Sequence, residues 1–426
     1  MFLLLKTEAC TLPIIQKDSN FQNNETGNLN DTPDYSRILN IYQRLINARG
    51  DFRYLVPKLY LKQEESHVAS IDYNKSEIVL EKKAYDVCSK FGDAAIAFLL
   101  AHELTHYYEK HAYGKIFFAS EIVDLNVSKN INSVQNQVLN ETQADYLGGF
   151  LAYSAGFGLF EKGDSLIANL YQSYGLGENL DGYPSKSDRM VLSKRIAEKV
   201  KTLVDVFEMA NLLSAIGKHH EAYLYYKYIL NQYQSREIYN NLGVSAVMDA
   251  MTYFNKDSLK FSYVNEMDVQ FRGSRDLANR KDSILKQAIF HFDAAISLDP
   301  DYSIAYLNKA NAYALLNNLS KAKFYLEEEA LPIVLKTKTN SKTLSDIHVL
   351  QGIIAAREGN NSLATTFFNK AIENNNQLGQ INLDVLNNVP HEMVNVVRIP
   401  TFDDTISNMS LKAFTQKIKM LRQSVS

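Results

Sequence analysis

The 426-residue chain contains few cysteines, no long apolar run and little net charge, and each of these absences excludes a class of protein. Two cysteines, Cys10 and Cys88, are too few for a disulfide framework. No run of 18 or more consecutive apolar residues occurs, so no transmembrane helix is expected. A formal net charge of -3 gives no reason to expect nucleic acid as a partner. Neither a G-x-S-x-G elbow nor a Gly-rich phosphate loop is present.

The sequence does contain an H-E-x-x-H motif, at His102–His106. The motif lies in the largely apolar stretch 93–108, which predicts a buried helix that begins at the N-cap signal Gly92-Asp93. Histidines four residues apart lie on one face of a helix, so His102 and His106 can reach the same metal ion. Glu103 can serve beside that ion as a general base, an arrangement typical of a zinc hydrolase.

Such a site needs a third protein ligand, and the metzincin pattern does not supply it. That pattern has a glycine at position 109 and a histidine at position 112, whereas this sequence has Glu109 and Ala112. His111 is one residue out of place and would point away from the face of the histidine pair. We therefore interpret His111 as a surface residue.

The acidic pair Glu141 and Asp145 is the better candidate. The two residues are one turn apart on a helix predicted from about 133 to 156, and an apolar run, 146–153, follows them at once. This run places the pair at the edge of a buried surface, where acids need a partner. We expect Glu141 to bind the metal and Asp145 to accept a hydrogen bond from the outer nitrogen of a ligating histidine.

With these two segments the chain resembles the gluzincin peptidases. H-E-L-T-H followed by E-T-Q-A-D-Y-L-G-G is similar to the motifs of the CAAX prenyl proteases, the HtpX membrane proteases and the periplasmic BepA-type proteases, over roughly residues 50–200. The resemblance implies one zinc ion per chain, held by His102, His106 and Glu141. It also implies that Glu103 activates water for peptide-bond hydrolysis and that Asp145 supports the site.

The family has a downstream H-P-x-x-x-x-R element, which this chain matches only in part. Pro184 and Arg189 are in place, but Tyr183 stands where the family has a histidine. In BepA-like enzymes that histidine can approach the zinc and hold the enzyme latent, so its absence puts such a latch in doubt. The Tyr183 hydroxyl can take the fourth metal position or donate to an oxyanion, or the ring can pack in a loop wall. We interpret Arg189 as a structural ion-pair partner.

The first half of the chain predicts an α+β, mostly α, zincin-type metalloprotease domain with a small sheet. Residues 1–34 are expected to form a flexible leader and residues 35–200 the domain itself. Three short segments with strand character, 58–62, 68–72 and 77–81, predict a sheet beside the H-E-x-x-H helix. Its edge strand is expected to pair with an extended peptide substrate, which favours low sequence specificity.

The second half shows helical pairs that repeat about every 34 residues. Small and aromatic residues recur at the positions that a tetratricopeptide repeat requires, as at Phe292, Gly352 and Phe368. The first helix of one pair, near Gly243, is separated from its partner by an insertion at roughly 252–282.

This pattern predicts an α-helical tetratricopeptide solenoid over residues 201–380, with a tail or cap at 381–426. The groove of such a solenoid binds peptide segments or partner proteins. The alternative is an unrelated helical domain.

The motifs together predict a zinc-dependent endopeptidase that hydrolyses misfolded or misassembled proteins, with repeats that recruit substrates or partners. The BepA-type proteases have this organisation, so the resemblance implies a soluble protein of the bacterial periplasm or cell envelope. The alternative is a latent or non-proteolytic scaffold or chaperone with a vestigial zinc site. The altered position Tyr183 favours that alternative. The intact Glu103 favours the enzyme, because a purely structural zinc site gains nothing from a water-activating carboxylate.

Overall fold

The computed structural model describes residues 29–63, 65, 67–109, 134–179, 185–254, 259–263, 277–337 and 341–389. The chain divides into two compact units between Val204 and Asp205, a point that lies within the long helix α6, Lys186–Ala215. We call the described residues up to Val204 the N-terminal unit and those from Asp205 the helical unit. The structure is mostly helical with one small sheet, as the sequence predicted.

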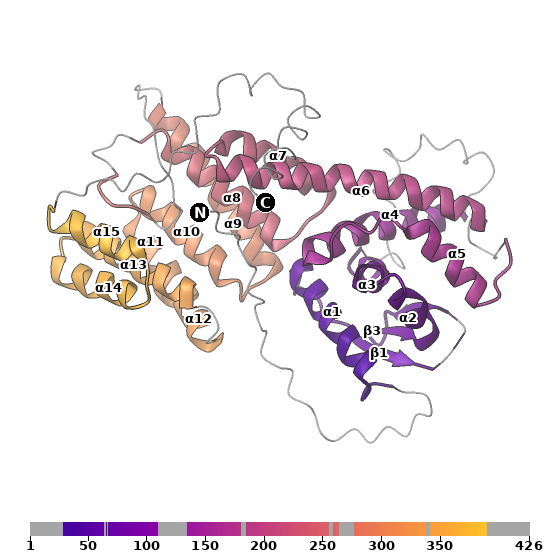
Figure 1. Cartoon of the computed structure of the whole chain (residues 1–426). Coiled ribbons are helices and arrows are strands. Elements are labelled where there is room, and N and C mark those ends of the chain that lie inside the picture. Colours follow the sequence, from indigo (N-terminus) through magenta and orange to yellow (C-terminus); the bar gives the residue numbers. More distant parts are fainter. Residues whose placement is uncertain are drawn as a thin grey trace, which may run out of the picture. The chain divides into compact units, whose positions relative to one another are not determined.

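The N-terminal unit consists of helices and one three-stranded sheet (Figure 1). Before α6, its elements in chain order are α1 (Pro33–Arg49), β1 (Lys58–Lys62), β2 (Ala69–Asp72), β3 (Glu77–Glu81), α2 (Lys82–Ser89), α3 (Asp93–Glu109), α4 (Val134–Ala152), η1 (Tyr153–Phe157) and α5 (Gly163–Ser173). Local signals set the ends of α1: the Thr32 side chain accepts from the Tyr35 N–H, and Gly50 adopts the left-handed conformation after the last turn.

The sheet has the order β1-β3-β2, in which β1 runs parallel and β2 antiparallel to β3. The outer edge of β1 is covered, because the Leu29 N–H donates to the Leu61 carbonyl and the Asn30 side chain accepts from the Leu61 N–H. Strand β2 is therefore the edge strand, and it packs against α3.

Helix α3 lies at the centre of the N-terminal unit, in contact with α1, α2, α4 and the sheet (Figure 1). Its apolar residues, such as Leu100, Ala101 and Leu104, are fully buried, which matches an apolar sequence without a polar face. The partner helix α4 ends at Ala152, earlier than the predicted Gly156. A π-helical turn follows, in which Gly156 takes a positive φ of 84° that a regular helix does not contain.

The helical unit consists of antiparallel helices that pack against their neighbours in the chain. After α6 they are α7 (His219–Gln232), α8 (Arg236–Met251), α9 (Leu277–Leu298), α10 (Ser303–Leu315), α11 (Leu319–Phe324), η3 (Tyr325–Ala330), α12 (Leu331–Thr337), α13 (Ser341–Arg357), α14 (Asn361–Glu373) and α15 (Gln377–Leu386). Helix α15 crosses position 380, where the sequence predicted the start of a tail or cap.

Two glycines bring paired helices of this unit close together. A Cβ added at Gly243 on α8 would overlap the ring of Phe292 on α9, and a Cβ at Gly352 on α13 would overlap the ring of Phe368 on α14. Both rings are completely buried. Helix α8 therefore pairs with α9 across the insertion, as the sequence predicted, and the same packing recurs in α13 and α14.

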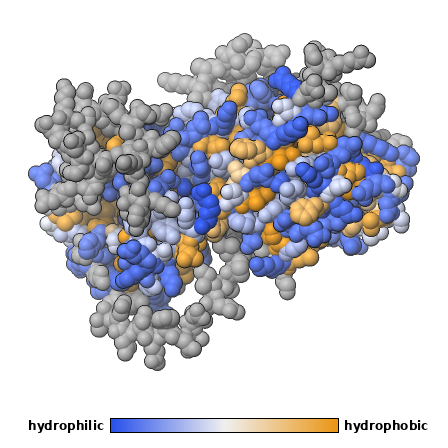
Figure 2. Space-filling view, turned by 180° about the vertical axis from the view of Figure 1, so that it is seen from behind, coloured by the Kyte–Doolittle hydropathy of each residue, from blue (hydrophilic) through white to orange (hydrophobic). Residues whose placement is uncertain are grey.

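Large apolar side chains that remain exposed occur mainly on the helical unit, and they include Leu224, Tyr228, Phe290 and Phe324. On the face shown in Figure 2, hydrophobic residues form separate patches among polar ones. Within the described ranges, no helix combines the length and the hydropathy that a membrane crossing requires.

His219, in the first turn of α7, predicts an acid sensitivity of the helical unit. The side chain is buried, and among the described residues neither ring nitrogen has a hydrogen-bond partner. Burial lowers its pKa from 6.5 to about 4. Between pH 6.5 and pH 4 the unfolded chain therefore binds a proton at this histidine more readily than the folded chain does. The free energy of unfolding falls as the pH drops through this range.

We expect the free energy of unfolding to fall between pH 7 and pH 5 by on the order of 1 kcal/mol more in the wild-type chain than in His219→Leu. Urea unfolding followed by far-UV circular dichroism at the two pH values measures this difference. His67→Leu, at an exposed histidine, is the control. Equal losses in the wild type and His219→Leu would contradict the prediction.

Candidate metal centre

Two turns of α3 place His102 and His106 side by side. Because the residues are four apart, their rings lie on the same face of the helix, with centroids 4.7 Å apart. The two Nε2 atoms are 3.0 Å apart. Both side chains are largely buried, with exposed fractions of 10% and 12%.

Helix α4 brings Glu141 to the same point. Its carboxylate oxygens lie 3.5 Å from the Nε2 of His102 and 3.5 Å from the Nε2 of His106. Glu141, Asp145 and Gly148 follow each other at intervals of four and three residues, so all three lie on the face of α4 that packs on α3.

The ligand atoms of His102, His106 and Glu141 all lie within 4.8 Å of one another, so these three residues can hold a metal ion. Around a tetrahedral ion with bonds of about 2.0–2.1 Å, neighbouring ligand atoms are about 3.3 Å apart. The two Nε2 atoms, 3.0 Å apart, are close to this spacing, and each lies 3.5 Å from a different oxygen of Glu141. The donor set of two imidazoles and one carboxylate leaves a fourth position to other atoms.

Asp145 orients the first histidine. Its Oδ1 lies 2.8 Å from the Nδ1 of His102, and its side chain is 14% exposed. A carboxylate at that distance favours a proton on Nδ1, so that the neutral ring, once it has lost its other proton, has its lone pair on Nε2, the atom nearest His106 and Glu141.

Glu103 is buried next to the cluster but contributes no atom to it. Burial raises its pKa to about 7; the neighbouring His102 opposes this rise and Glu141 adds to it. A carboxyl group with a pKa near neutrality can both accept and return a proton at physiological pH, which is the requirement for a general base.

The charges in the cluster compensate one another. Burial alone would lower the pKa of His102, but its contacts with Asp145 and Glu141 outweigh this effect and raise that pKa well above 6.5. Burial alone would raise the pKa of Glu141, but the hydrogen bond with His102 and the nearby His106 and Arg189 lower it to about 2. The cluster therefore holds a proton on His102 that a bound cation would displace.

Arg189, in the first turn of α6, has Glu141 as its partner. Its Nη2 lies 3.6 Å from the Oε2 of Glu141. The guanidinium is mostly buried, and although burial lowers its pKa, Glu141 and Asp145 raise it more. Arg189 therefore stays charged and holds Glu141 against the histidine pair.

Gly148 allows α4 to approach α3 at the cluster. A Cβ at this position would lie 2.8 Å from the backbone nitrogen of His102 and 2.9 Å from the carbonyl carbon of Ala101. Such contacts with backbone atoms cannot be relieved by turning a side chain. The absence of a side chain at position 148 thus sets the distance between the helix that carries the histidines and the helix that carries Glu141.

The structure brings together His102, Glu103, His106, Glu141 and Asp145, all of which the sequence singled out. Tyr183 lies outside the described residues, as does His111. The sequence analysis did not identify the role of Gly148. Its position seven residues after Glu141 does indicate that the two residues lie on the same face of α4. Nor was the partner of Arg189 found from the sequence.

No protein-family model matches this chain, and no curated protein sequence is similar to it.

Proposed function

We propose that the chain is a zinc-dependent endopeptidase of the gluzincin type. The observation that carries the proposal is the group of two imidazole nitrogens and one carboxylate, close enough together to hold one metal ion, next to a buried carboxyl group, Glu103, that is not a ligand. A purely structural metal site has no use for such a carboxyl group. The resemblance of the two motifs to gluzincin sequences supports the same conclusion.

Zinc fits the donor set better than the other common divalent ions. Two imidazole nitrogens with one carboxylate suit zinc, whereas magnesium and calcium prefer six or more oxygen ligands. When bound, zinc would lower the pKa of a water molecule and polarise the carbonyl group of the substrate.

The chain's own side chains supply the remaining chemistry. Glu103 would take the proton from the attacking water and pass it to the leaving amine. Asp145 would keep His102 in the ligating tautomer, and Arg189 would keep Glu141 in place.

The edge strand β2 is the proposed binding surface for the substrate backbone. The Glu81 N–H donates to the Val68 carbonyl, so Val68 faces β3 with its backbone polar groups. In an antiparallel pair this orientation alternates from residue to residue, so the N–H and C=O of Ile71, three residues later, point away from β3. The strand ends near the metal ligands, since the hydroxyl of Tyr73 donates to the backbone carbonyl of His106 at 3.2 Å. An extended peptide that pairs with Ile71 would be bound through its backbone hydrogen bonds. This mode of binding favours unfolded proteins of varied sequence as substrates.

The helical unit completes the proposal as a tetratricopeptide-type array that recruits protein substrates or partners. Support comes from the recurring glycine and phenylalanine packing in α8–α9 and α13–α14, and from the repeat pattern in the sequence. The resemblance to BepA-type proteases favours a location in the bacterial envelope.

Zinc content and cleavage of an unfolded protein test the proposal together. The purified chain is expected to bind one zinc ion and to cleave casein, with activity lost on chelation and restored by zinc. Zinc binding without cleavage of any unfolded substrate would instead favour the scaffold hypothesis.

Asp145→Asn is expected to weaken zinc affinity by about 10–100-fold, because the amide no longer favours a proton on the Nδ1 of His102. Competition with a chromogenic chelator measures the dissociation constant. Asp249→Asn is a matched control, since Asp249 also contacts a histidine, His220, at 3.2 Å but lies in the helical unit. Equal zinc affinity in the two variants would contradict the role assigned to Asp145.

A further inference from the structure

A segment between α8 and α9 is fixed to the C-terminal helices of the helical unit. The side chain of Asn382 on α15 accepts from the Ser262 N–H and donates to the Ser262 carbonyl, both at 2.7 Å. Tyr263 is buried, and its hydroxyl accepts from Arg357 at 2.8 Å. Residues 259–263 therefore form a fixed wall over helices that are about 100 residues away in the sequence.

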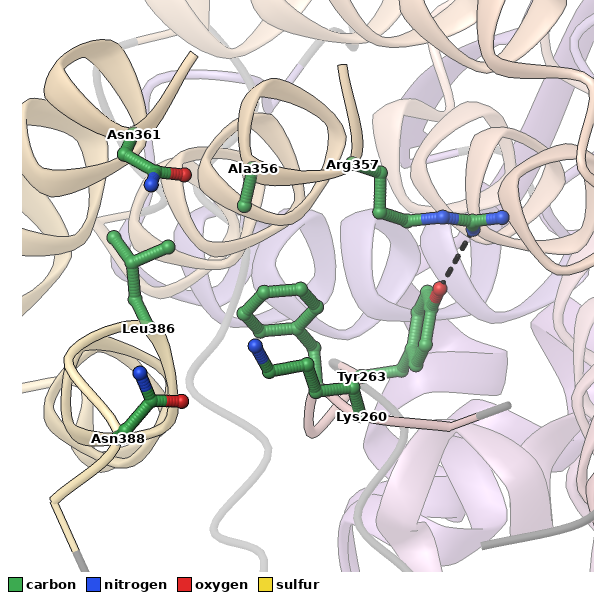
Figure 3. A pocket seen from close by; sticks show the side chains of 8 residues that line it. Lys260, Tyr263, Ala356, Arg357, Asn361, Leu386 and Asn388 are labelled. Atoms are coloured by element: carbon green, nitrogen blue, oxygen red, sulfur yellow. Dashed lines mark hydrogen bonds between the residues drawn. The ribbon is translucent and has the colours of Figure 1, made fainter. Parts of the chain in front are cut away.

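A cavity of about 420 Å³ lies between this wall and the ends of α13, α14 and α15 (Figure 3). The residues that line it are Lys260, Phe261, Tyr263, Ala356, Arg357, Asn361, Leu386 and Asn388. The volume is within the range of small-molecule and peptide-anchor sites. It exceeds what a simple inorganic anion fills.

The polar side chains that line the cavity include donors, and none of them has an acidic partner among the described residues. Two of the lining residues are cationic and none is acidic. Within the described part of the chain, no carboxylate forms an ion pair with Lys260 or Arg357, and no hydrogen bond engages the side-chain amide of Asn361 or Asn388. Figure 3 shows Lys260, Asn361 and Asn388 around the same space. Positive charge and amide donors that converge in this way favour an anionic ligand.

The two cations have different roles. The guanidinium of Arg357 is held by uncharged acceptors, which are the Tyr263 hydroxyl, the Ala314 carbonyl and the Asn317 side chain. It adds positive charge while it supports the wall. The ammonium of Lys260 lies 5.8 Å from the centre of the Phe261 ring and is the charged group that can reach a ligand directly.

We propose that this cavity binds a carboxylate that carries an apolar group, as found at the C-terminus of a peptide. Lys260 and the amides of Asn361 and Asn388 would bind the carboxylate. The side chains of Phe261, Ala356 and Leu386 would pack against the apolar group. This ligand differs from the peptide bond proposed for the metal centre, and the proposal does not depend on catalysis.

Isothermal titration calorimetry on the full-length chain carrying Glu103→Gln, which avoids cleavage of the probe, tests the proposal. The probes are acetyl-Gly-Gly-Leu with a free carboxylate, the same peptide as an amide, isovalerate and inorganic phosphate. The free acid is expected to bind at least about tenfold more tightly than the amide, because a charge-assisted hydrogen bond is lost with the carboxylate. Isovalerate binding as tight as the peptide acid would also support the site and identify a small acid as its ligand.

Lys260→Gln is expected to weaken binding of the acid about tenfold, and Ala356→Leu, which fills the cavity, to abolish it. Lys370→Gln is the matched control, since Lys370 lies 5.5 Å from the ring centre of Phe367 and does not line the cavity. Equal affinities for acid and amide, unchanged binding in both Lys260→Gln and Ala356→Leu, or binding of phosphate alone would overturn the proposal.

Discussion

Replacing Glu103 with glutamine is expected to reduce the rate of peptide-bond hydrolysis by about 10²–10⁴-fold while the chain still binds zinc. Glutamine has the same shape as glutamate, but its amide cannot accept a proton from water. Glu103 contributes no atom to the ligand group, so the substitution leaves His102, His106 and Glu141 intact. Initial rates of casein cleavage and the zinc content of the same preparations measure the two effects.

Glu109→Gln is the control for this experiment, because Glu109 lies on the same helix, pairs with Arg49 at 2.9 Å and does not belong to the ligand group. It is expected to retain wild-type activity. If Glu103→Gln kept more than about a tenth of the wild-type rate, Glu103 would not be the general base. If it lost zinc, Glu103 would instead act as a ligand or a packing residue.

The substitution Gly148→Ala, which adds a single methyl group, is expected to weaken zinc binding by at least about tenfold. Loss of a side chain that orients a metal ligand has an effect of the same size. The Cβ of Gly148→Ala would press on backbone atoms of His102 and Ala101 at 2.8–2.9 Å, so α3 and α4 must separate. Separation moves Glu141 away from the histidines. Overpacking of this kind also costs about 1–3 kcal/mol of folding free energy.

The neighbouring glycine offers a close control. A Cβ at Gly149 would meet side-chain atoms instead of backbone, the nearest being a methyl group of Val200 at 3.1 Å, and a small side-chain movement relieves that contact. Both substitutions gain about 1 kcal/mol of helix propensity, so that contribution cancels in the comparison. Zinc affinity by chelator competition and urea unfolding should therefore separate Gly148→Ala from Gly149→Ala. Similar values for the two variants would show that the helix spacing at Gly148 does not control the site.

Much of the candidate site was predictable from the sequence because its key spacings are local. The interval of four residues in His102–His106 and again in Glu141–Asp145 requires only a helix to put each pair on one face. The apolar runs around both pairs predicted that α3 and α4 are buried. The contact of Arg189 with Glu141 could not be predicted, because it joins the first turn of α6 to the middle of α4, and no spacing in the sequence relates two residues of separate helices.

The same reasoning explains what was predictable in the helical unit. Small residues and aromatics at repeat spacing predicted that α8 pairs with α9 and α13 with α14. The return of residues 259–263 to α15 depends on Asn382 and Ser262, which are 120 positions apart. Polar residues inside an insertion have no pattern that points to a distant partner, so neither the contact nor the cavity beside it could be found before the structure.

The link between Ser262 and Asn382 also affects how the helical unit unfolds. Arrays of helical pairs in which each pair contacts only its neighbours tend to fray from their ends, and their stability is a sum of local contributions. Here a segment between α8 and α9 is hydrogen-bonded to α15, the last helix among the described residues. Opening α15 therefore also requires residues 259–263 to detach from it. The stability of α14 and α15 is in this way coupled to that of α8 and α9. The link raises the cooperativity of the array and, because it closes a long loop, is expected to form late in folding.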